Sequence, residues 1–205
     1  MTTKILIADD HTIVRAGLAA LLETERDFEV VGQAKNGLDA VRETEKLRPD
    51  VIIMDLMMPK MDGVEATREI CAKVPEAKVI VLTTFGTSDG IAHALDAGAR
   101  GALLKNAENT QLFKAIHAVA RGETFVSPDI RHQLSANPPI PHLTPRQKDV
   151  LAAMVQGMTD RDIARRFSIR LDGVNSHVRD ILAKLNASNR TEAVAIALRQ
   201  HLLKI

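Results

Sequence analysis

The fold is decided by four apolar runs, Lys4-Ile-Leu-Ile-Ala-Asp9-Asp10, Val51-Ile-Ile-Met-Asp55, Val79-Ile-Val-Leu-Thr83 and Ala102-Leu-Leu-Lys105. Each run ends in a charged or hydroxyl side chain. Short continuous apolar runs are typical of strands buried on both faces, as in a parallel sheet. The carboxyl ends of parallel strands meet at one edge of an open sheet. We therefore expect three carboxylates, a hydroxyl and an ammonium to converge there.

Strand and helix patterns alternate through the first 121 residues. A further strand is predicted near 28–34, and amphipathic helices are predicted near 11–24, 37–47, 62–73, 88–97 and 109–121. Strands that alternate with helices form a parallel sheet covered on both faces. The fold class is therefore α/β, with a doubly wound five-stranded parallel sheet.

The length of 205 residues predicts two domains, and the charge divides between them. Residues 1–124 carry 15 Lys and Arg against 19 Asp and Glu, whereas residues 125–205 carry 12 against 7. A basic C-terminal part suits a polyanion such as nucleic acid, although an ordinary solvated surface can carry the same charge. We expect a linker at 125–142, with a short helix after Ser127-Pro128 and a stiff Pro-rich spacer before residue 142.

Composition narrows the class of protein further. The single Cys71 cannot form an intramolecular disulfide, and its apolar neighbours favour a packing role. Trp and Tyr are absent, which disfavours binding of single strands by base stacking. No run approaches the ~18 apolar residues of a membrane span, so we expect a cytoplasmic protein without membrane contact.

Asp9, Asp10 and Asp55 form a predicted acidic cluster that repels itself and calls for a hard divalent cation. Oxygen ligands favour Mg²⁺, and no His or Cys group has zinc-type spacing. With that charge neutralised and Lys105 nearby, Asp55 can attack phosphorus and become an acyl phosphate, with Thr83 bonded to a phosphoryl oxygen. Any one of these carboxylates alone would be better explained as a loop cap, but the convergence favours a site. For His11 we favour a structural or indirect role over phosphoryl donation or metal ligation.

These residues resemble the receiver domain of bacterial response regulators. The match runs through Ile-Ala-Asp9-Asp10-His, Ile-Met-Asp55-Leu-Met-Met-Pro59-Lys-Met-Asp62-Gly63, Val-Leu-Thr83-Thr84 and Leu-Leu-Lys105, and spans nearly all of residues 1–121. The resemblance implies a flavodoxin-like receiver over residues 1–124. It also implies that Asp55 accepts a phosphoryl group from a sensor histidine kinase, with Thr83 and Lys105 assisting. Mg²⁺ would be bound by Asp10, Asp55 and the Met57 backbone carbonyl, with Asp9 helping through water. Many receivers have an aromatic residue where this chain has Ala102.

The C-terminal part predicts four helices, at 145–156, 160–167, about 172–185 and 190–203. Thr144-Pro145 is a typical helix start, and two helices joined by a tight turn are a candidate helix-turn-helix. Periodicity alone does not separate a DNA-binding domain from a structural bundle. Basic residues on or beside the second and third helices favour DNA.

Residues 143–198 also resemble the DNA-binding domain of LuxR-type regulators, through Leu143-Thr-Pro-Arg146, Asp162-Ile-Ala164, His177-Val178 and Asn189-Arg190-Thr-Glu192-Ala193. A receiver joined to such a domain is typical of the NarL/FixJ family. The resemblance implies a separate all-α domain over 143–205, whose third helix enters the major groove. Its last helix often dimerises, here through Val194, Ala197, Leu198 and His201. The chain departs from the family at Gln147, Arg170, Gly173 and Asn175. We expect base contacts from Asn175, Ser176 and Arg179 and phosphate contacts from Arg170, Lys184 and Arg190.

The sequence is thus predicted to encode a phosphorylation-dependent transcription regulator, not an enzyme, that binds double-stranded DNA as a homodimer. In our switching hypothesis, the unphosphorylated receiver covers the C-terminal domain and phosphorylation releases it. An alternative is an adaptor whose helix-turn-helix binds protein. An aspartyl phosphatase ranks last, because no general acid for turnover is evident.

Overall fold

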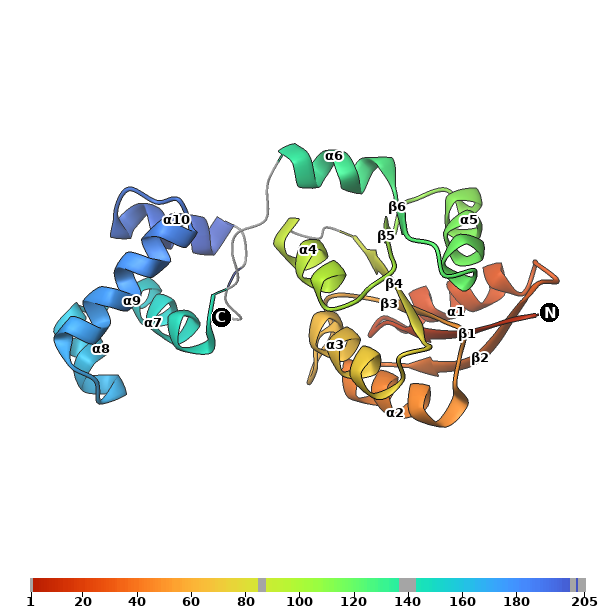
Figure 1. The fold of residues 1–205 in the computed structure, drawn as a ribbon, viewed down its shortest axis with the longest axis horizontal. Coiled ribbons are helices and arrows are strands. Elements are labelled where there is room, and N and C mark those ends of the chain that lie inside the picture. The colour runs from red at the N-terminus through yellow and green to blue at the C-terminus, as the bar shows by residue number, and fades with distance from the viewer. Residues whose placement is uncertain (1, 85–87, 137–142, 200–201, 203–205) are drawn as a thin grey trace. The chain divides into compact units, whose positions relative to one another are not determined.

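The computed structural model describes residues 2–84, 88–136, 143–199 and 202. It divides into two compact units, Met1–Pro139 and Ile140–Ile205, and each is described by itself (Figure 1). Most of the predicted Pro-rich spacer, residues 137–142, lies outside the described residues. Within the described ranges, no helix is both long and apolar enough to cross a membrane.

The first unit is built on a parallel sheet that, in the described residues, has six strands in the order β2-β1-β3-β4-β5-β6. The strands are β1 (Thr3–Ala8), β2 (Phe28–Ala34), β3 (Val51–Met54), β4 (Lys78–Thr83), β5 (Gly101–Leu104) and β6 (Phe125–Val126). The helices are α1 (Thr12–Leu22), α2 (Gly37–Leu47), α3 (Gly63–Lys73), α4 (Ser88–Asp96), α5 (Asn109–Ala120) and α6 (Pro128–Ala136). The predicted α/β class with a parallel sheet is confirmed.

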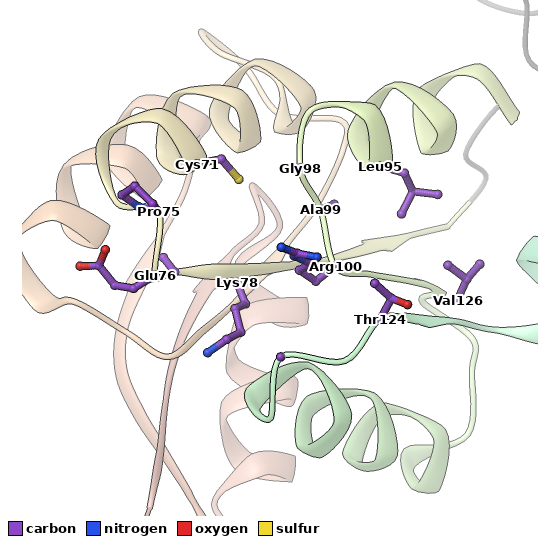
Figure 2. A pocket seen from close by; sticks show the side chains of 12 residues that line it. Cys71, Pro75, Glu76, Lys78, Leu95, Gly98, Ala99, Arg100, Thr124 and Val126 are labelled. Carbon is purple, nitrogen blue, oxygen red and sulfur yellow. The ribbon is translucent and has the colours of Figure 1, made fainter.

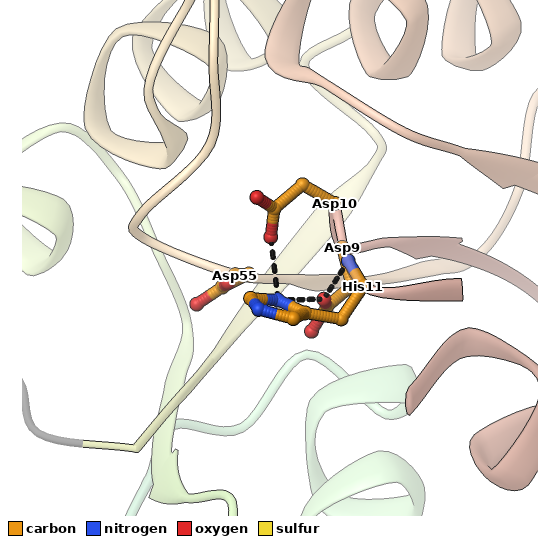
Figure 3. Close-up of side chains that lie close together, drawn as sticks. All are labelled: Asp9, Asp10, His11 and Asp55. Carbon is orange, nitrogen blue, oxygen red and sulfur yellow. Dashed lines mark hydrogen bonds and ion pairs between the residues drawn. The ribbon is translucent and has the colours of Figure 1, made fainter. Parts of the chain in front are cut away.

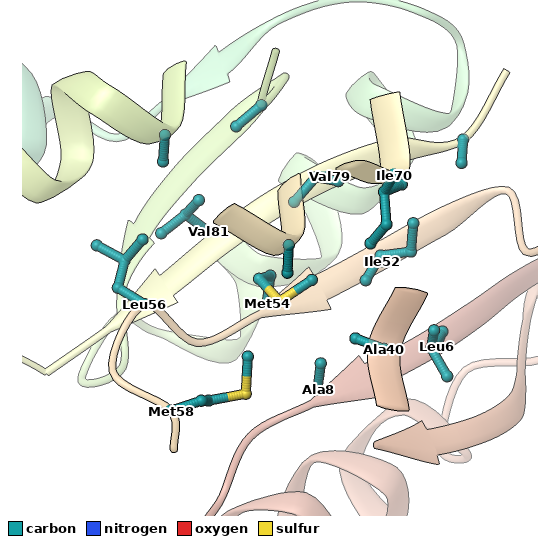
Figure 4. Close-up of a cluster of buried hydrophobic side chains, with 14 of the residues drawn as sticks. Leu6, Ala8, Ala40, Ile52, Met54, Leu56, Met58, Ile70, Val79 and Val81 are labelled. Carbon is teal, nitrogen blue, oxygen red and sulfur yellow. The ribbon is translucent and has the colours of Figure 1, made fainter. Parts of the chain in front are cut away.

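Alternate residues of each strand face opposite layers of helices, which is why the apolar runs are continuous. Ile5 and Ile7 pack with α1 and α5, whereas Leu6 and Ala8 pack with α2 and α3. Figure 4 shows the second of these clusters, in which Ile52, Met54, Val79 and Val81 from β3 and β4 meet Ala40 and Ile70 from the helices. The sheet is therefore covered on both faces, as a doubly wound fold requires.

The prediction of five strands is wrong, because Phe125 and Val126 form a sixth. Gly101 pairs with Phe125 and Ala102 with Val126 at the edge of the sheet. Helix α6 follows, and its Ile130 is fully buried in the core of the first unit. The first residues of the expected linker therefore pack with the first unit. A two-residue strand is too short to show the alternation by which strands are recognised in sequence.

A hollow of about 920 Å³ lies where β4 and β5 begin, at the opposite edge from the predicted acidic cluster (Figure 2). Cys71, Lys78, Arg100 and Thr124 are among its lining residues. Burial raises the pKa of the Cys71 thiol, which makes it a poor nucleophile, in agreement with the predicted packing role.

The second unit contains four helices within its described residues, as predicted. They are α7 (Pro145–Val155), α8 (Asp160–Phe167), α9 (Leu171–Lys184) and α10 (Arg190–Arg199). Their shared core contains Val150, Leu151, Ile163, Val174, Ile181 and Ala193, all fully buried. Thr144 with Gln147 and Thr159 with Asp162 form capping boxes at the starts of α7 and α8, which fixes where these two helices begin.

Candidate functional site

The strand register brings the predicted acidic residues to one edge of the sheet. Ala8 pairs with Met54, so Asp9 and Asp55, the next residues, leave adjacent strands side by side. The Asp55 amide donates to the Ala8 carbonyl at 2.8 Å, and the Lys105 amide donates to the Thr83 carbonyl at 2.7 Å. With the pairing of β3 and β4, these backbone hydrogen bonds join the four chain segments at the ends that carry Asp9, Asp55, Thr83 and Lys105.

The carboxylates form a compact and largely buried cluster (Figure 3). Asp9 and Asp55 are 2% and 4% exposed, while the Asp10 side chain is about one-third exposed. One donor atom from each of these three residues and from His11 lies within 4.8 Å of the others. Burial of so much like charge is costly unless cations stabilise it.

Lys105 supplies one cation. Its Nζ lies 2.5 Å from Asp9 Oδ2 and 2.9 Å from Asp55 Oδ2. Burial tends to lower the pKa of this ammonium, but the hydrogen bonds and charges of Asp9 and Asp55 outweigh that effect, so its pKa is raised. Lys105 therefore remains charged and bridges two of the three carboxylates.

Despite this partner, the negative charge of the Asp55 carboxylate is still disfavoured by burial. Burial raises its pKa, and the hydrogen bond and charge of Lys105 and the backbone hydrogen bond from Met57 offset only part of the shift. Its backbone is also closely packed. A Cβ on Gly63 would lie 2.1 Å from the Asp55 carbonyl oxygen, so only glycine fits where α3 begins beside the acidic cluster.

The residues present fit a hard divalent cation. Asp10 Oδ1 is buried and has no hydrogen-bond partner, although buried carboxylate oxygens are normally paired. Both oxygens of Asp9 are engaged, Oδ1 by the His11 amide at 2.8 Å and Oδ2 by Lys105. Asp10 and Asp55 thus retain the oxygen atoms best able to contact an ion directly, which suits the oxygen preference of Mg²⁺.

Thr83 and Met57 lie next to the cluster. Thr83 is the last residue of β4 and is 1% exposed. The Met57 side chain projects outward with 68% exposure, so only its backbone can serve the site. Ala102, in the position of the aromatic residue of many receivers, is fully buried; it pairs with Val126 of β6 and shares a core cluster with Ile130 of α6.

In the second unit, α9 carries most of the predicted DNA-contacting residues on an exposed face. Arg170, Asn175, Ser176 and Arg179 are all exposed. Unlike α7 and α8, α9 begins without a side-chain cap, because its N-cap residue is Arg170. The Arg170 guanidinium at this helix start favours an anion, although Asp172 in the first turn opposes one and the Gly173 amide already donates to the Arg170 carbonyl.

Lys184 and Arg190, two of the predicted phosphate contacts, are engaged within the unit. Lys184 Nζ donates to Gln147 Oε1 at 2.8 Å. Arg190 forms a close ion pair with Asp160 and donates to the Met158 carbonyl, which ties the start of α10 to the start of α8. Sequence alone did not show these partners, because each joins residues about thirty positions apart.

The last helix presents fewer residues for dimerisation than the family pattern implies. Ala197 is 2% exposed and belongs to the core, whereas Leu198 is 47% exposed. Val194 packs partly against that core. His201 lies outside the described residues.

Comparison with known proteins agrees with both units. The response regulator receiver domain matches residues 5–117, and the luxR family of bacterial regulatory proteins matches residues 141–197. The transcriptional regulatory protein LiaR of Bacillus subtilis is 39% identical over 208 residues, which cover 98% of this chain and 99% of LiaR. The chain belongs to the NarL/FixJ, or LuxR-type, family of two-component response regulators.

Other relatives of this response regulator match over its full length. The response regulator protein VraR of Staphylococcus aureus is 36% identical over 209 residues, which cover all of both chains. The solved structure of RcsB from Salmonella enterica serovar Typhimurium, bound to promoter DNA in the presence of the phosphomimetic BeF₃⁻, matches with a TM-score of 0.70 at 27% identity, covering 96% of this chain and 98% of that one.

Proposed function

We propose that this response regulator accepts a phosphoryl group on Asp55 from a sensor histidine kinase and thereby controls its binding to promoter DNA. The observation that carries this proposal is the bridge from Lys105 to Asp9 and Asp55 beside a buried Asp10 oxygen that makes no hydrogen bond. A lysine that spans two buried carboxylates, next to oxygens suited to Mg²⁺, matches what phosphoryl transfer to a carboxylate requires.

The chemistry places most of the work on positioning. A carboxylate oxygen of Asp55 attacks phosphorus and forms the P–O bond of an acyl phosphate. The P–N bond to the donor histidine breaks, and its electron pair stays on nitrogen. Lys105 then pairs with the phosphoryl group, and the Thr83 hydroxyl donates to a phosphoryl oxygen. Mg²⁺, held by Asp10, Asp55 and the Met57 carbonyl, with Asp9 acting through water, supplies charge neutralisation when bound.

Labelling tests this assignment. The full chain is incubated with acetyl phosphate and MgCl₂, and intact mass spectrometry measures the gain of one phosphoryl group. Asp55→Asn should gain none, whereas Asp27→Asn, which alters an exposed carboxylate, should be labelled like the wild type. Labelling of Asp55→Asn at the wild-type level would overturn the assignment.

The DNA-binding part of the proposal rests on α9. Asn175, Ser176 and Arg179 form an exposed polar face, and their side chains match those that contact base edges in the major groove. The exposed Arg170 guanidinium at the start of α9 favours a backbone phosphate. LiaR is described as a transcriptional regulator and RcsB has been solved on DNA. Lys184 and Arg190 remain proposed contacts, but their internal partners make them weaker candidates.

Salt dependence distinguishes DNA binding from the protein-binding adaptor. Once chromatin footprinting has identified a promoter, the affinity of the protein for that DNA should fall steeply between ~50 and ~200 mM salt, because protein binding releases cations from the DNA. The affinity of a contact with an apolar protein groove would change little with salt.

We also propose that the protein acts in the cytoplasm, binds DNA as a homodimer and does not turn over a substrate as an enzyme.

A further inference from the structure

His11 is placed against the acidic cluster more closely than its position in the sequence indicates. Its Nδ1 lies 2.7 Å from Asp10 Oδ1 and 3.4 Å from Asp9 Oδ1 (Figure 3). The ring is nevertheless 67% exposed, so no apolar packing holds it there. The position of this imidazole is therefore explained by the carboxylates and not by the core.

The spacing of these atoms resembles the edge of a coordination octahedron. Adjacent ligands about 2.1 Å from one octahedral ion lie roughly 3 Å apart. The separations of His11 Nδ1 from the Asp10 and Asp9 oxygens, 2.7 and 3.4 Å, bracket that value. The nitrogen is thus at the distance expected of a neighbouring ligand.

A hydrogen bond between the two side chains does not account for the contact. Asp10 Oδ1 has no hydrogen-bond partner, even though His11 Nδ1 is only 2.7 Å away. Without that hydrogen bond, the contact drawn in Figure 3 is an ion pair only when the imidazole is protonated. When Nδ1 carries no proton, its lone pair faces the Asp10 carboxylate oxygen with nothing between them, and a cation that both atoms contact satisfies both.

We propose that His11 supplies a nitrogen ligand at this site, so that the receiver binds nitrogen-preferring divalent ions such as Ni²⁺ and Co²⁺ through Asp10 and His11 in addition to Mg²⁺. This inference rests on the metal site of the proposed function. Imidazole is a strong ligand for these borderline ions, whereas Mg²⁺ prefers oxygen and retains water. Removal of His11 should therefore weaken Ni²⁺ and leave Mg²⁺ nearly unchanged.

Calorimetric titration of the untagged full chain with MgCl₂ and NiCl₂ tests the proposal, at about pH 8 because only neutral imidazole binds a metal. His11→Gln should lower Ni²⁺ affinity about tenfold or more and change Mg²⁺ affinity less than about twofold. The visible spectrum of bound Co²⁺ should also change in this variant, because a nitrogen ligand is lost. His132→Gln, which alters an exposed histidine on α6, should behave as the wild type does.

Two other results would overturn the proposal. Equal Ni²⁺ affinity in His11→Gln and the wild type would show that the ring is not a ligand, and an equal loss of Mg²⁺ and Ni²⁺ affinity would show that it only supports the fold of the site. Either result leaves the proposed function intact if Mg²⁺ binds the wild type. Failure of the wild type to bind Mg²⁺, or of Asp10→Asn to lose it, would contradict the proposed metal site itself.

Discussion

Asp55 carries a negative charge in an environment that opposes it. Burial raises its pKa above the ordinary value of 3.8, and Lys105, shared with Asp9, offsets only part of the shift. The folded protein therefore holds a proton on Asp55 at a pH where the unfolded chain has lost it. As pH rises through this window, the free energy of unfolding decreases.

Asp55→Asn should therefore make the metal-free protein more stable at neutral pH. The gain should shrink as pH falls towards and below 3.8, because wild-type Asp55 is then protonated in both states. Urea unfolding in EDTA across this range measures the difference. A variant that is less stable than the wild type at pH 7 would contradict this account of the site.

Substitutions on α9 should distinguish residues that contact bases from residues that contact phosphates. Asn175→Ala should cost ~1–3 kcal/mol of discrimination at one base pair, whereas Arg170→Ala should weaken all sequences alike and reduce the salt slope by ~1. Binding of a set of single-base promoter variants measures both. An equal loss of affinity for every promoter variant in Asn175→Ala would contradict a base contact for that residue.

Arg190→Ala provides a contrast. Its internal ion pair with Asp160 predicts that this change lowers the stability of the second unit.

At the scale of elements, α8 ends on a residue with a strained backbone. Ser168 adopts the left-handed conformation, with φ of 52°, which costs a residue with a Cβ about 1–2 kcal/mol. The equivalent positions after α5 and α7 are glycines with positive φ, Gly122 and Gly157. The fold evidently needs this conformation wherever the chain leaves these helices.

Ser168→Gly should raise the stability of the second unit by about 0.5–1 kcal/mol, after allowance for the greater freedom of glycine in the unfolded chain. Thermal unfolding of the full chain, followed at the transition of that unit, measures the effect. Gly157→Ser is the converse change and should destabilise. If both changes had the same sign, the backbone conformation would not be the cause.

Strand β6 and helix α6 should contribute to receiver stability rather than act as a linker. A fragment that ends at residue 124 removes the buried Ile130 and one edge of the sheet. It should be less stable than a fragment ending at 139, and Ile130→Ala in the full chain should cost ~2–5 kcal/mol. Denaturant unfolding compares them, with exposed His132→Ala as the control; equal stability of the two fragments would refute the assignment.

At the scale of the whole molecule, the switching hypothesis requires phosphorylation of the first unit to change how the second unit binds DNA. In the proposed function, an acyl phosphate at Asp55 would add about two negative charges beside Lys105 and Thr83. The short aliphatic Ala102, buried in the same core cluster as Ile130 of α6, cannot swing between two positions as an aromatic side chain can. We therefore expect the response to phosphorylation to be transmitted by displacement of the backbone at Thr83 and of helix α4. Helix α4 is linked to α6, because the Ser88 hydroxyl donates to the Gln133 carbonyl at 3.3 Å.

The full chain treated with BeF₃⁻ and Mg²⁺ should therefore dimerise and bind promoter DNA more tightly than the untreated chain. Sedimentation and fluorescence anisotropy measure the two effects on one sample. Asp55→Asn should not respond. Unchanged mass and unchanged affinity in the treated wild type would defeat the switching hypothesis.

Much of the receiver could be predicted from sequence because its signals are local and repeat along the chain. The apolar runs before Asp9, Asp55, Thr83 and Lys105 determined a parallel sheet, and parallel strands carry their last residues to one edge. The four C-terminal helices followed from periodicity and from the caps at Thr144 and Thr159.

Only the tertiary structure decided the contacts between distant residues. The sixth strand arises because β5 offers an unpaired edge to Phe125 and Val126, which have no pattern of their own. The pairing of Arg190 with Asp160 and the approach of His11 to Asp10 without a hydrogen bond depend on side-chain directions that packing sets. Local sequence determines which residues meet at an edge, whereas burial and charge in the folded chain determine what each one touches.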